Sequence, residues 1–430
     1  MNKKILNLAI PNIITNITVP LLGMVDLAIV GHIGDEKHIG AIALGTMIFN
    51  LIYWNFGFLR MGTSGFTAQA YGANDTKECL KILVRGSAIA VSIATLLILL
   101  QSPVGWLSGK LIKGSEDTIN LALSYFYIRI WAAPATLGLY VLKGWFIGMQ
   151  NAKYPMIVAI TLNVVNIIFS LIFAVVLKLG IRGVAMGTVL AQYSGLIIAI
   201  ILWIKKYGYL RKDIEIKESL KFQEMKTFFK VNSDIFLRTL CLVAVFTFIP
   251  AISASMGDRI LAVNTLLMQL FTLFSYIMDG FAYAGEALVG KYIGAKDNRS
   301  LQQSVKLLLR WGIIITIAFT LIYLFWGRNI LSLLTNNREV INTAMEYIIW
   351  SLLVPICGFA AFLFDGIYIG ATESKTMRNS MFIATAVFFI LYFVLINTMG
   401  NNGLWIAFLF YLAFRGGLLW LMAPKKIKVS

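Results

Sequence analysis

The chain alternates long apolar runs with short polar segments along its whole length. Runs of about 20 apolar residues are long enough to cross a bilayer as helices. A hydropathy window places twelve such runs. Their approximate extents are 8–33, 40–70, 80–102, 119–146, 155–177, 183–204, 233–256, 260–290, 304–326, 343–369, 377–398 and 402–423. The pattern therefore predicts an all-α polytopic membrane protein with about twelve transmembrane helices.

The composition agrees with a membrane protein, since 59% of the 430 residues are hydrophobic and 13% are charged. An ordinary soluble domain has about 25% charged residues. The three cysteines and two histidines are spread too thinly for a disulfide framework or a metal site. We therefore expect that the protein is not an enzyme and that it binds neither a cofactor nor a metal. The N-terminus runs directly into the first span without a small-residue cleavage site, so we expect no removable signal peptide.

The distribution of Lys and Arg predicts the orientation. With the N-terminus inside, the inner segments carry about three times as many basic residues as the outer ones, as the positive-inside rule requires. This rule accounts for the net charge of +17 without a nucleic-acid partner. We predict a multi-pass protein of the bacterial inner (plasma) membrane with both termini in the cytoplasm.

One long polar segment, Lys205 to Lys230, lies near the middle of the chain. Its basic residues alternate with Phe, Leu and Ile, which is typical of a helix lying at the membrane surface. A solvated linker explains the same composition, and both interpretations stay open. The segment divides the chain into an N-terminal lobe over 1–204, a cytoplasmic linker over 205–230 and a C-terminal lobe over 231–430.

The two sides of this linker repeat each other at an offset of about 220 residues. The matching pairs are Gly72 with Gly294, Pro134 with Pro355, Gly144 with Gly366, Gly148 with Gly370, and Gly180 with Gly400. Several matches at nearly one offset predict two pseudo-symmetric six-helix lobes in the same orientation. Parallel repeats of this kind are typical of secondary transporters, with the substrate site between the repeats.

The first span, from Ile10 to Gly34, contains a single acid, Asp26, together with Pro11 and Pro20. Helical spacing puts polar or small residues on one stripe: Asn12, Asn16, Gly23 and Asp26. A charged side chain at this depth costs about 2.5 to 3.5 kcal/mol on insertion scales, so its presence favours a function. We predict that Asp26 carries a proton or binds a cation; the alternative is a structural acid that is hydrogen-bonded inside a bundle.

At the end of the second span the chain reads FLRMGTSG over 58–65, and before it VPLLGMVDLAIVGHIG over 19–34. Together they resemble the multidrug and toxic compound extrusion family, in particular its DinF-like branch. The stretches 232–239, 279–290 and 365–372 resemble the same branch in its seventh, eighth and tenth helices. The resemblance covers essentially the whole chain.

This resemblance implies antiport of organic compounds by alternating access of two six-helix lobes, with Asp26 as the proton-linked acid. The family's fifth helix carries an Asn-x-x-x-Asp pattern. Here Asn166 matches the first position, but Ser170 stands where the second acid would be. Thr188 and Tyr125 are weaker matches that could hydrogen-bond Asp26, or that could simply be satisfied polar residues at helix contacts.

The second half holds its own acids and bases. Asp234 and Arg238 are four residues apart and are predicted to pair along one helical face. With Glu286 and Asp365 they are predicted to form a polar network that closes the inner side; a solvated cluster at the membrane edge is the alternative. Asp279 lies deeper and is predicted to meet a cationic substrate.

Aromatic and methionine side chains of the eighth span are candidates for lining a substrate cavity, because aromatic faces attract organic cations. The candidates are Met268, Phe271, Phe274, Tyr276 and Met278. Packing against lipid or against other helices is the alternative for each of them.

Taken together, the sequence predicts a monomeric, proton-coupled exporter of small, mostly cationic organic molecules. Sodium-coupled antiport stays open, because no residue distinguishes H⁺ from Na⁺. A lipid-linked sugar flippase of the same superfamily also stays open, although it would favour a strongly cationic cavity and the predicted spans hold few basic residues.

Overall fold

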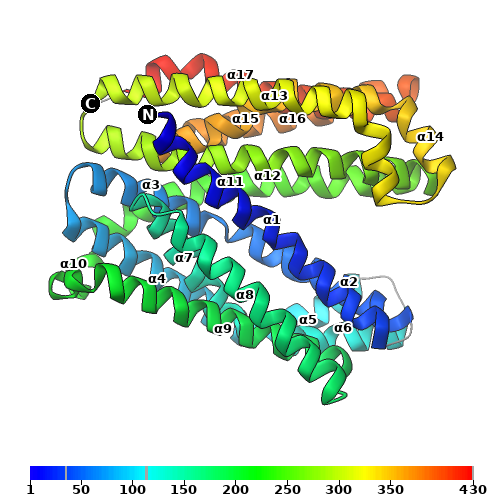
Figure 1. The fold of residues 1–430 in the computed structure, drawn as a ribbon, viewed down its shortest axis with the longest axis horizontal. Helices are drawn as coiled ribbons and strands as arrows, with labels where there is room; N and C mark the ends of the chain where they lie inside the picture. Colours follow the sequence, from blue (N-terminus) through cyan, green and yellow to red (C-terminus); the bar gives the residue numbers. More distant parts are fainter. Residues whose placement is uncertain (34–35, 112–114, 429–430) are drawn as a thin grey trace. The chain divides into compact units, whose positions relative to one another are not determined.

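The computed structural model describes residues 1–33, 36–111 and 115–428. Predictions that involve three positions lie outside these ranges: Gly34 at the end of the stretch Ile10 to Gly34, Lys113 among the basic residues assigned to the outer side, and Ser430 at the end of the C-terminal lobe. The described residues form helices joined by short turns, with no strand among them. Figure 1 follows these helices along the chain.

The first half runs through α1 (Asn2–Ile33), α2 (Glu36–Asn55), α3 (Phe58–Gly72), α4 (Thr76–Leu99), α5 (Gln101–Leu111), α6 (Glu116–Arg129), the 3₁₀ turn η1 (Ile130–Ala132), α7 (Ala133–Gly148), α8 (Lys153–Leu171), the π-helical turn η2 (Ile172–Val176) and α9 (Gly180–Tyr207). The second half runs through η3 (Gly208–Asp213), α10 (Ile216–Ser219), α11 (Phe222–Ser255), α12 (Asp258–Gly294), α13 (Asn298–Leu334), α14 (Arg338–Glu346), α15 (Ile348–Gly370), α16 (Ser374–Met399) and α17 (Asn401–Lys426).

Twelve segments of the described chain are long and apolar enough to cross a membrane, which confirms the predicted number of spans. The sequence missed two interruptions. The second span breaks between α2 and α3, and η1 interrupts the fourth span just before Pro134. Proline fixes its own backbone angle and cannot donate to the helical ladder, so a tightened turn ahead of it is a natural place for a helix to change direction.

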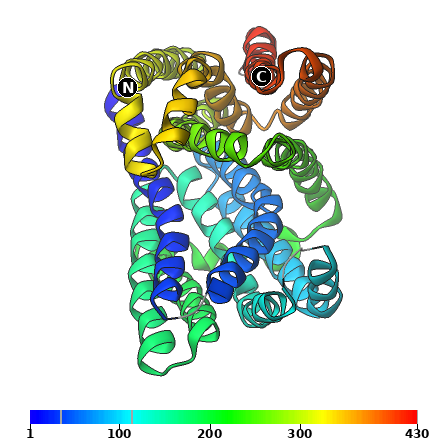
Figure 2. The same cartoon turned by 90° about the vertical axis from the view of Figure 1, so that its right-hand side faces the viewer.

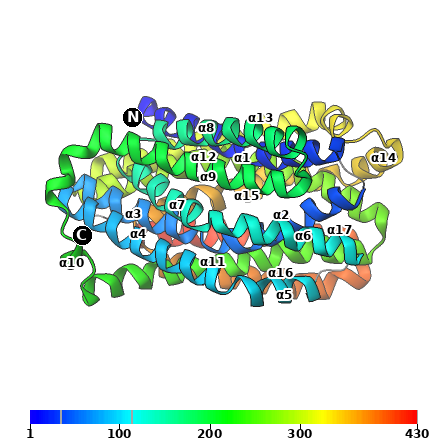
Figure 3. The same cartoon turned by 90° about the horizontal axis from the view of Figure 1, so that it is seen from below.

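The chain divides into two compact units. Unit 2 comprises Ile14–Phe229, and unit 1 comprises Met1–Ile13 together with Lys230–Ser430. Two helices, α1 and α11, therefore begin in one unit and continue into the other. In unit 2, helices α3, α4 and α7 run alongside one another (Figure 3). In unit 1, α16 and α17 lie side by side and are seen nearly end-on in Figure 2.

The turns that follow corresponding helices in the two halves have the same backbone conformation. Asn74 has a φ of 58° after α3, and Lys296 has a φ of 54° after α12. The next residue then caps the following helix: Asp75 accepts from the Glu78 N–H at 2.9 Å, and Asp297 accepts from the Ser300 N–H at 3.0 Å. The repeat found in the sequence is therefore a repeat of local structure.

The helix crossings repeat as well. A methyl group added at Gly148 of α7 would lie 2.8 Å from the carbonyl oxygen of Ser64 in α3. A methyl group added at Gly370 of α15 would lie 2.5 Å from the carbonyl oxygen of Glu286 in α12. Small residues let membrane helices approach to backbone contact. In each unit, glycine thus sets the distance between two crossing helices: α3 and α7 in unit 2, and α12 and α15 in unit 1.

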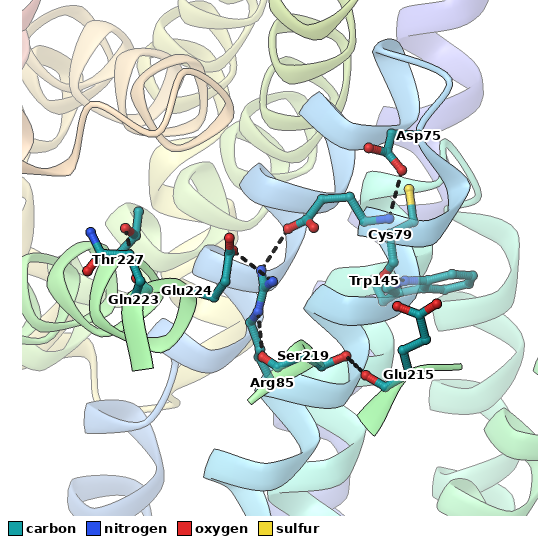
Figure 4. Close-up of polar contacts among 10 residues, drawn as sticks. Asp75, Cys79, Arg85, Trp145, Glu215, Ser219, Gln223, Glu224 and Thr227 are labelled. Carbon is teal, nitrogen blue, oxygen red and sulfur yellow. Dashed lines mark hydrogen bonds and ion pairs between the residues drawn. The ribbon is translucent and has the colours of Figure 1, made fainter. Parts of the chain in front are cut away.

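The polar segment 205–230 forms neither a single surface helix nor a plain linker. Its first residues complete α9, its last residues start α11, and η3 and α10 lie between them. Arg85 of α4 holds this segment (Figure 4). Its guanidinium donates to the Ser219 carbonyl oxygen at 2.9 Å, to Glu78 at 2.7 Å and to Glu224 at 2.8 Å. A pocket of 230 Å³ lies beside this contact, between α3, α4 and the start of α11.

Candidate functional site

Asp26 lies in a buried polar cluster of unit 2. Its side chain belongs to the second half of α1 and is 3% exposed. Asn166 and Ser170 of α8 and Thr188 of α9 are its polar neighbours, and all three are buried. The structure thus brings together four of the five residues that were predicted to form one site.

Thr188 connects the members of this cluster. Its hydroxyl oxygen lies 3.4 Å from Oδ2 of Asp26 and accepts a hydrogen bond from the Asn166 amide at 3.1 Å. The same oxygen lies 3.1 Å from the Val184 carbonyl oxygen. A hydroxyl has one hydrogen to donate, so Asp26 and Val184 compete for it. The other oxygen of Asp26, Oδ1, is buried and has no hydrogen-bond partner among the described residues.

Close helix packing fixes the position of this cluster. A methyl group added at Gly187 of α9 would lie 2.5 Å from the hydroxyl of Ser170, so α8 and α9 touch directly beside Thr188. Helix α1 is fastened to α8 by the Asn163 amide, which donates to the Thr18 carbonyl oxygen at 3.0 Å. The site is therefore built on three helices whose spacing is set by small residues and by one backbone contact.

Tyr125 takes a different place from the one expected. Its hydroxyl accepts a hydrogen bond from Arg129 at 2.7 Å, and its ring packs against Gly45 of α2. The Arg129 guanidinium lies 4.7 Å from the centre of the Phe49 ring and interacts electrostatically with Asp26. Tyr125 therefore positions Arg129, a residue that sequence reasoning did not select. Arg129 could have been identified from the sequence, because it is a basic residue within an apolar span.

The predicted polar stripe on α1 is only partly correct. Asn12 and Asp26 are buried, but they belong to different units. Gly23 is exposed, and a methyl group added there would meet nothing within 4 Å. Helical spacing identifies residues that share a face, but it does not determine which part of that face is covered.

The charged residues of unit 1 form ion pairs, but with partners that differ from the predicted ones. Asp234 accepts from Arg378 at 2.6 Å and from the Ser374 hydroxyl at 2.9 Å, not from Arg238. Arg238 of α11 pairs with Asp365 of α15, and Arg415 of α17 donates to the same oxygen, Oδ2. The expected pair within one helix is therefore wrong, because both residues find partners on neighbouring helices.

The remaining acids of unit 1 lie on α12. Glu286 is fully buried where α12 crosses Gly370 of α15, and Asp279 is half-buried two turns earlier. Asp279 also acts electrostatically on Arg415. The two acids share a side of α12 but differ in burial, since Glu286 is fully buried and Asp279 is half-buried.

The candidates for lining a substrate cavity divide into two groups. Phe271, Phe274 and Met278 are buried, and both rings pack 6.0 Å from the Phe362 ring within unit 1. Met268 and Tyr276 are half-buried, like Asp279. The buried group packs the interior of the unit, whereas the half-buried group keeps surface available for a ligand.

Among the described residues, no group of three or more His, Cys, Asp or Glu side chains could hold a metal ion. The buried polar chemistry therefore consists of carboxylates, hydroxyls, amides and guanidinium groups. Such groups can bind and release protons, cations and anions.

Comparison with known proteins agrees with this architecture. The MatE family model matches residues 11–172 and 235–395. DNA damage-inducible protein F of Escherichia coli (strain K12) is 36% identical over 96% of this chain and 90% of its own length. Human multidrug and toxin extrusion protein 1 is 24% identical over 88% of this chain and 64% of its own length. A crystal structure of MATE in the bent conformation has a TM-score of 0.88 at 19% identity, covering 99% of this chain and 95% of that chain.

Twelve spans in two repeated lobes, with a buried acid on the first helix, define a polytopic transporter rather than an enzyme. The chain belongs to the MatE family of multidrug and toxic compound extrusion (MATE) efflux transporters. The predicted resemblance and fold class are thereby confirmed.

Proposed function

We propose that the chain is a proton-coupled exporter of organic, mostly cationic, compounds in the bacterial inner membrane. The single observation that carries this proposal is the environment of Asp26. One oxygen of this buried carboxylate contacts Thr188, and the other has no hydrogen-bond partner among the described residues. A carboxyl group placed in this way has a position at which a proton can be added.

Protonation would change the hydrogen bonds of the cluster. Ionised Asp26 attracts the Thr188 hydrogen strongly, because hydrogen bonds to charged acceptors are about twice as strong as neutral ones. Once Asp26 is neutral, the Val184 carbonyl becomes the better acceptor for that hydrogen. Thr188 would then release Asp26 while Asn166 continues to donate to the Thr188 oxygen.

Release of Asp26 would loosen the second half of α1. Pro20 cannot donate to the helical ladder, so α1 has a weak point between the Thr18 contact with α8 and Asp26. Proton uptake and cation binding would then exclude each other at one carboxylate, which antiport requires. Separately, the half-buried Asp279 of unit 1 remains our candidate for an acid that meets a cationic substrate.

The test compares Asp26→Asn with Asp117→Asn in proteoliposomes, at matched amounts of folded protein. Asp117 also belongs to unit 2, but its side chain is 67% exposed and pairs with Lys37 at the surface. We expect Asp26→Asn to abolish efflux of an organic cation driven by a pH gradient, and Asp117→Asn to retain it. Unchanged pH-driven efflux in Asp26→Asn would refute the proton-carrier role.

Sodium coupling is tested in the same vesicles. Wild-type efflux that follows an imposed sodium gradient and ignores the pH gradient would replace H⁺ by Na⁺ as the coupling ion. Substrate-driven proton release in sodium-free buffer is the result expected for proton coupling.

A further inference from the structure

Arg238 and Arg415 meet at a single carboxylate inside unit 1. They come from α11 and α17, and both donate from Nη2 to Oδ2 of Asp365 on α15. The three side chains are 4% to 9% exposed. This cluster belongs to unit 1, whereas Asp26 belongs to unit 2, and the proton cycle proposed above does not use it.

The donors and acceptors of this cluster do not balance. A guanidinium carries five N–H donors, so the pair offers ten. The Nε atoms of Arg238 and Arg415 are buried, and neither has an acceptor among the described residues. Oδ1 of Asp365 likewise has no donor among them. Both arginines therefore share one oxygen while other buried donors stay without a partner.

The charges do not balance either. Two guanidinium groups face one carboxylate, which leaves one positive charge. The neighbouring acid Asp234 is already engaged by Arg378 and Ser374. Asp279 acts on Arg415, but it is half-buried, and solvent screens an exposed charge more than a buried one. An uncompensated charge among membrane-spanning helices is costly and usually functional.

The Arg415 guanidinium also lies near an aromatic ring, with its carbon 5.5 Å from the centre of the Phe362 ring. A π-face attracts a cation but is not a carboxylate or carbonyl acceptor, so the buried Nε–H still has no acceptor among the described residues. The nearby Tyr411 hydroxyl, which donates to the Met381 sulfur at 3.1 Å, is a neutral group and cannot cancel the charge.

We propose that Arg238 and Arg415 form a binding site for one monovalent anion, either a halide or the carboxylate of an organic molecule. The anion would accept hydrogen bonds from guanidinium donors that Asp365 leaves unused, and it would cancel the remaining positive charge. A buried water molecule could accept a hydrogen bond but could not cancel the charge. Guanidinium groups suit this role because they stay charged and match planar or spherical anions.

The experiment measures the melting temperature of the full-length protein in a buffer of bulky gluconate at constant ionic strength. Gluconate is replaced stepwise by chloride or bromide in one arm, and by acetate or benzoate in the other. A ligand that binds only the folded state raises the melting temperature in a saturable way. A response to halides alone identifies an inorganic anion, and a response to carboxylates alone identifies an organic one.

Arg415→Gln should lose the saturable response, whereas Arg378→Gln should keep it, because Arg378 is paired with its own acid, Asp234. Because Arg415→Gln could fail to fold, binding of radioactive chloride and of labelled benzoate to the wild type is measured as well. Absence of saturable binding in both arms, or an equal response in wild type and Arg415→Gln, would overturn the proposal. The readout requires neither drug nor proton transport, so it is independent of the function proposed above.

Discussion

Replacing Gly366 by alanine tests the helix crossing on which unit 1 is built. The added methyl group would lie 2.6 Å from the carbonyl carbon and 2.8 Å from the Cα of Ala282 on α12. Ordinary contacts begin at 3.4 Å, so α12 and α15 would have to separate. The obstacle is backbone rather than a flexible side chain, so rotation of a side chain cannot relieve it.

The expected loss follows from two opposing terms. Overpacking of this kind costs about 1 to 3 kcal/mol, and backbone contacts belong at the upper end. Alanine gains about 1 kcal/mol over glycine in helix propensity. The net loss of about 2 kcal/mol corresponds to a melting temperature lower by about 4 to 8 °C for a unit of this size.

Gly417→Ala is the matched control. Gly417 lies in α17 of the same unit, and a methyl group added there meets nothing within 4 Å. Thermal unfolding of both purified variants in one detergent is followed by tryptophan fluorescence and by recovery of monodisperse protein. If Gly366→Ala and Gly417→Ala melt at the same temperature, the close crossing of α12 and α15 is not present in the protein.

Three further outcomes are expected. Thr188→Val should slow proton-driven efflux from proteoliposomes while Thr188→Ser retains it, and equal rates would remove Thr188 from the coupling cluster. Hydrogen bonds from Ser300 lower the pKa of Asp297, so this helix cap stabilises the protein at a pH above the usual pKa of Asp, and the stabilisation is lost as the pH falls through the lowered pKa. Asp297→Asn should therefore reduce the fall in melting temperature at acidic pH. An unchanged dependence of the melting temperature on pH would contradict this. Arg85→Gln should expose residues 214–221 to protease more than Glu224→Gln does, because Arg85 also holds the Ser219 carbonyl; equal cleavage would argue against that contact.

The sequence predicted the number of spans and most of their ends, because hydrophobic runs and basic flanks are local signals. It missed the breaks between α2 and α3 and at η1, which depend on how neighbouring helices pack. The predicted linker over 205–230 contains the end of α9 and the start of α11, because amphipathic helix ends and a solvated linker have similar compositions. Arg85 contacts this segment at the Ser219 carbonyl oxygen.

The site was predicted where family motifs supplied partners, and missed where charge pairing depended on the fold. Asn166, Ser170 and Thr188 do surround Asp26. Asp234 was predicted to pair with Arg238 because they are one turn apart. In the structure Asp234 pairs with Arg378 of α16, and Arg238 pairs with Asp365 of α15. Arg129 and Arg415 were available in the sequence as basic residues within spans, and each lies beside an acid or an aromatic ring.

Each unit contains a corresponding helix crossing, but the side chains beside the crossing differ between the units. Next to Gly144 in unit 2 stands Lys143, which interacts with Arg60, and next to Gly366 in unit 1 stands Asp365, which is held by two arginines. Facing Gly148 is Ser64, whereas facing Gly370 is Glu286. Glycine at the crossing fixes the backbones, so the adjacent side chains can change charge without altering the fold. One repeated scaffold can thus carry two basic side chains beside the crossing in unit 2 and a carboxylate held by two arginines beside the crossing in unit 1.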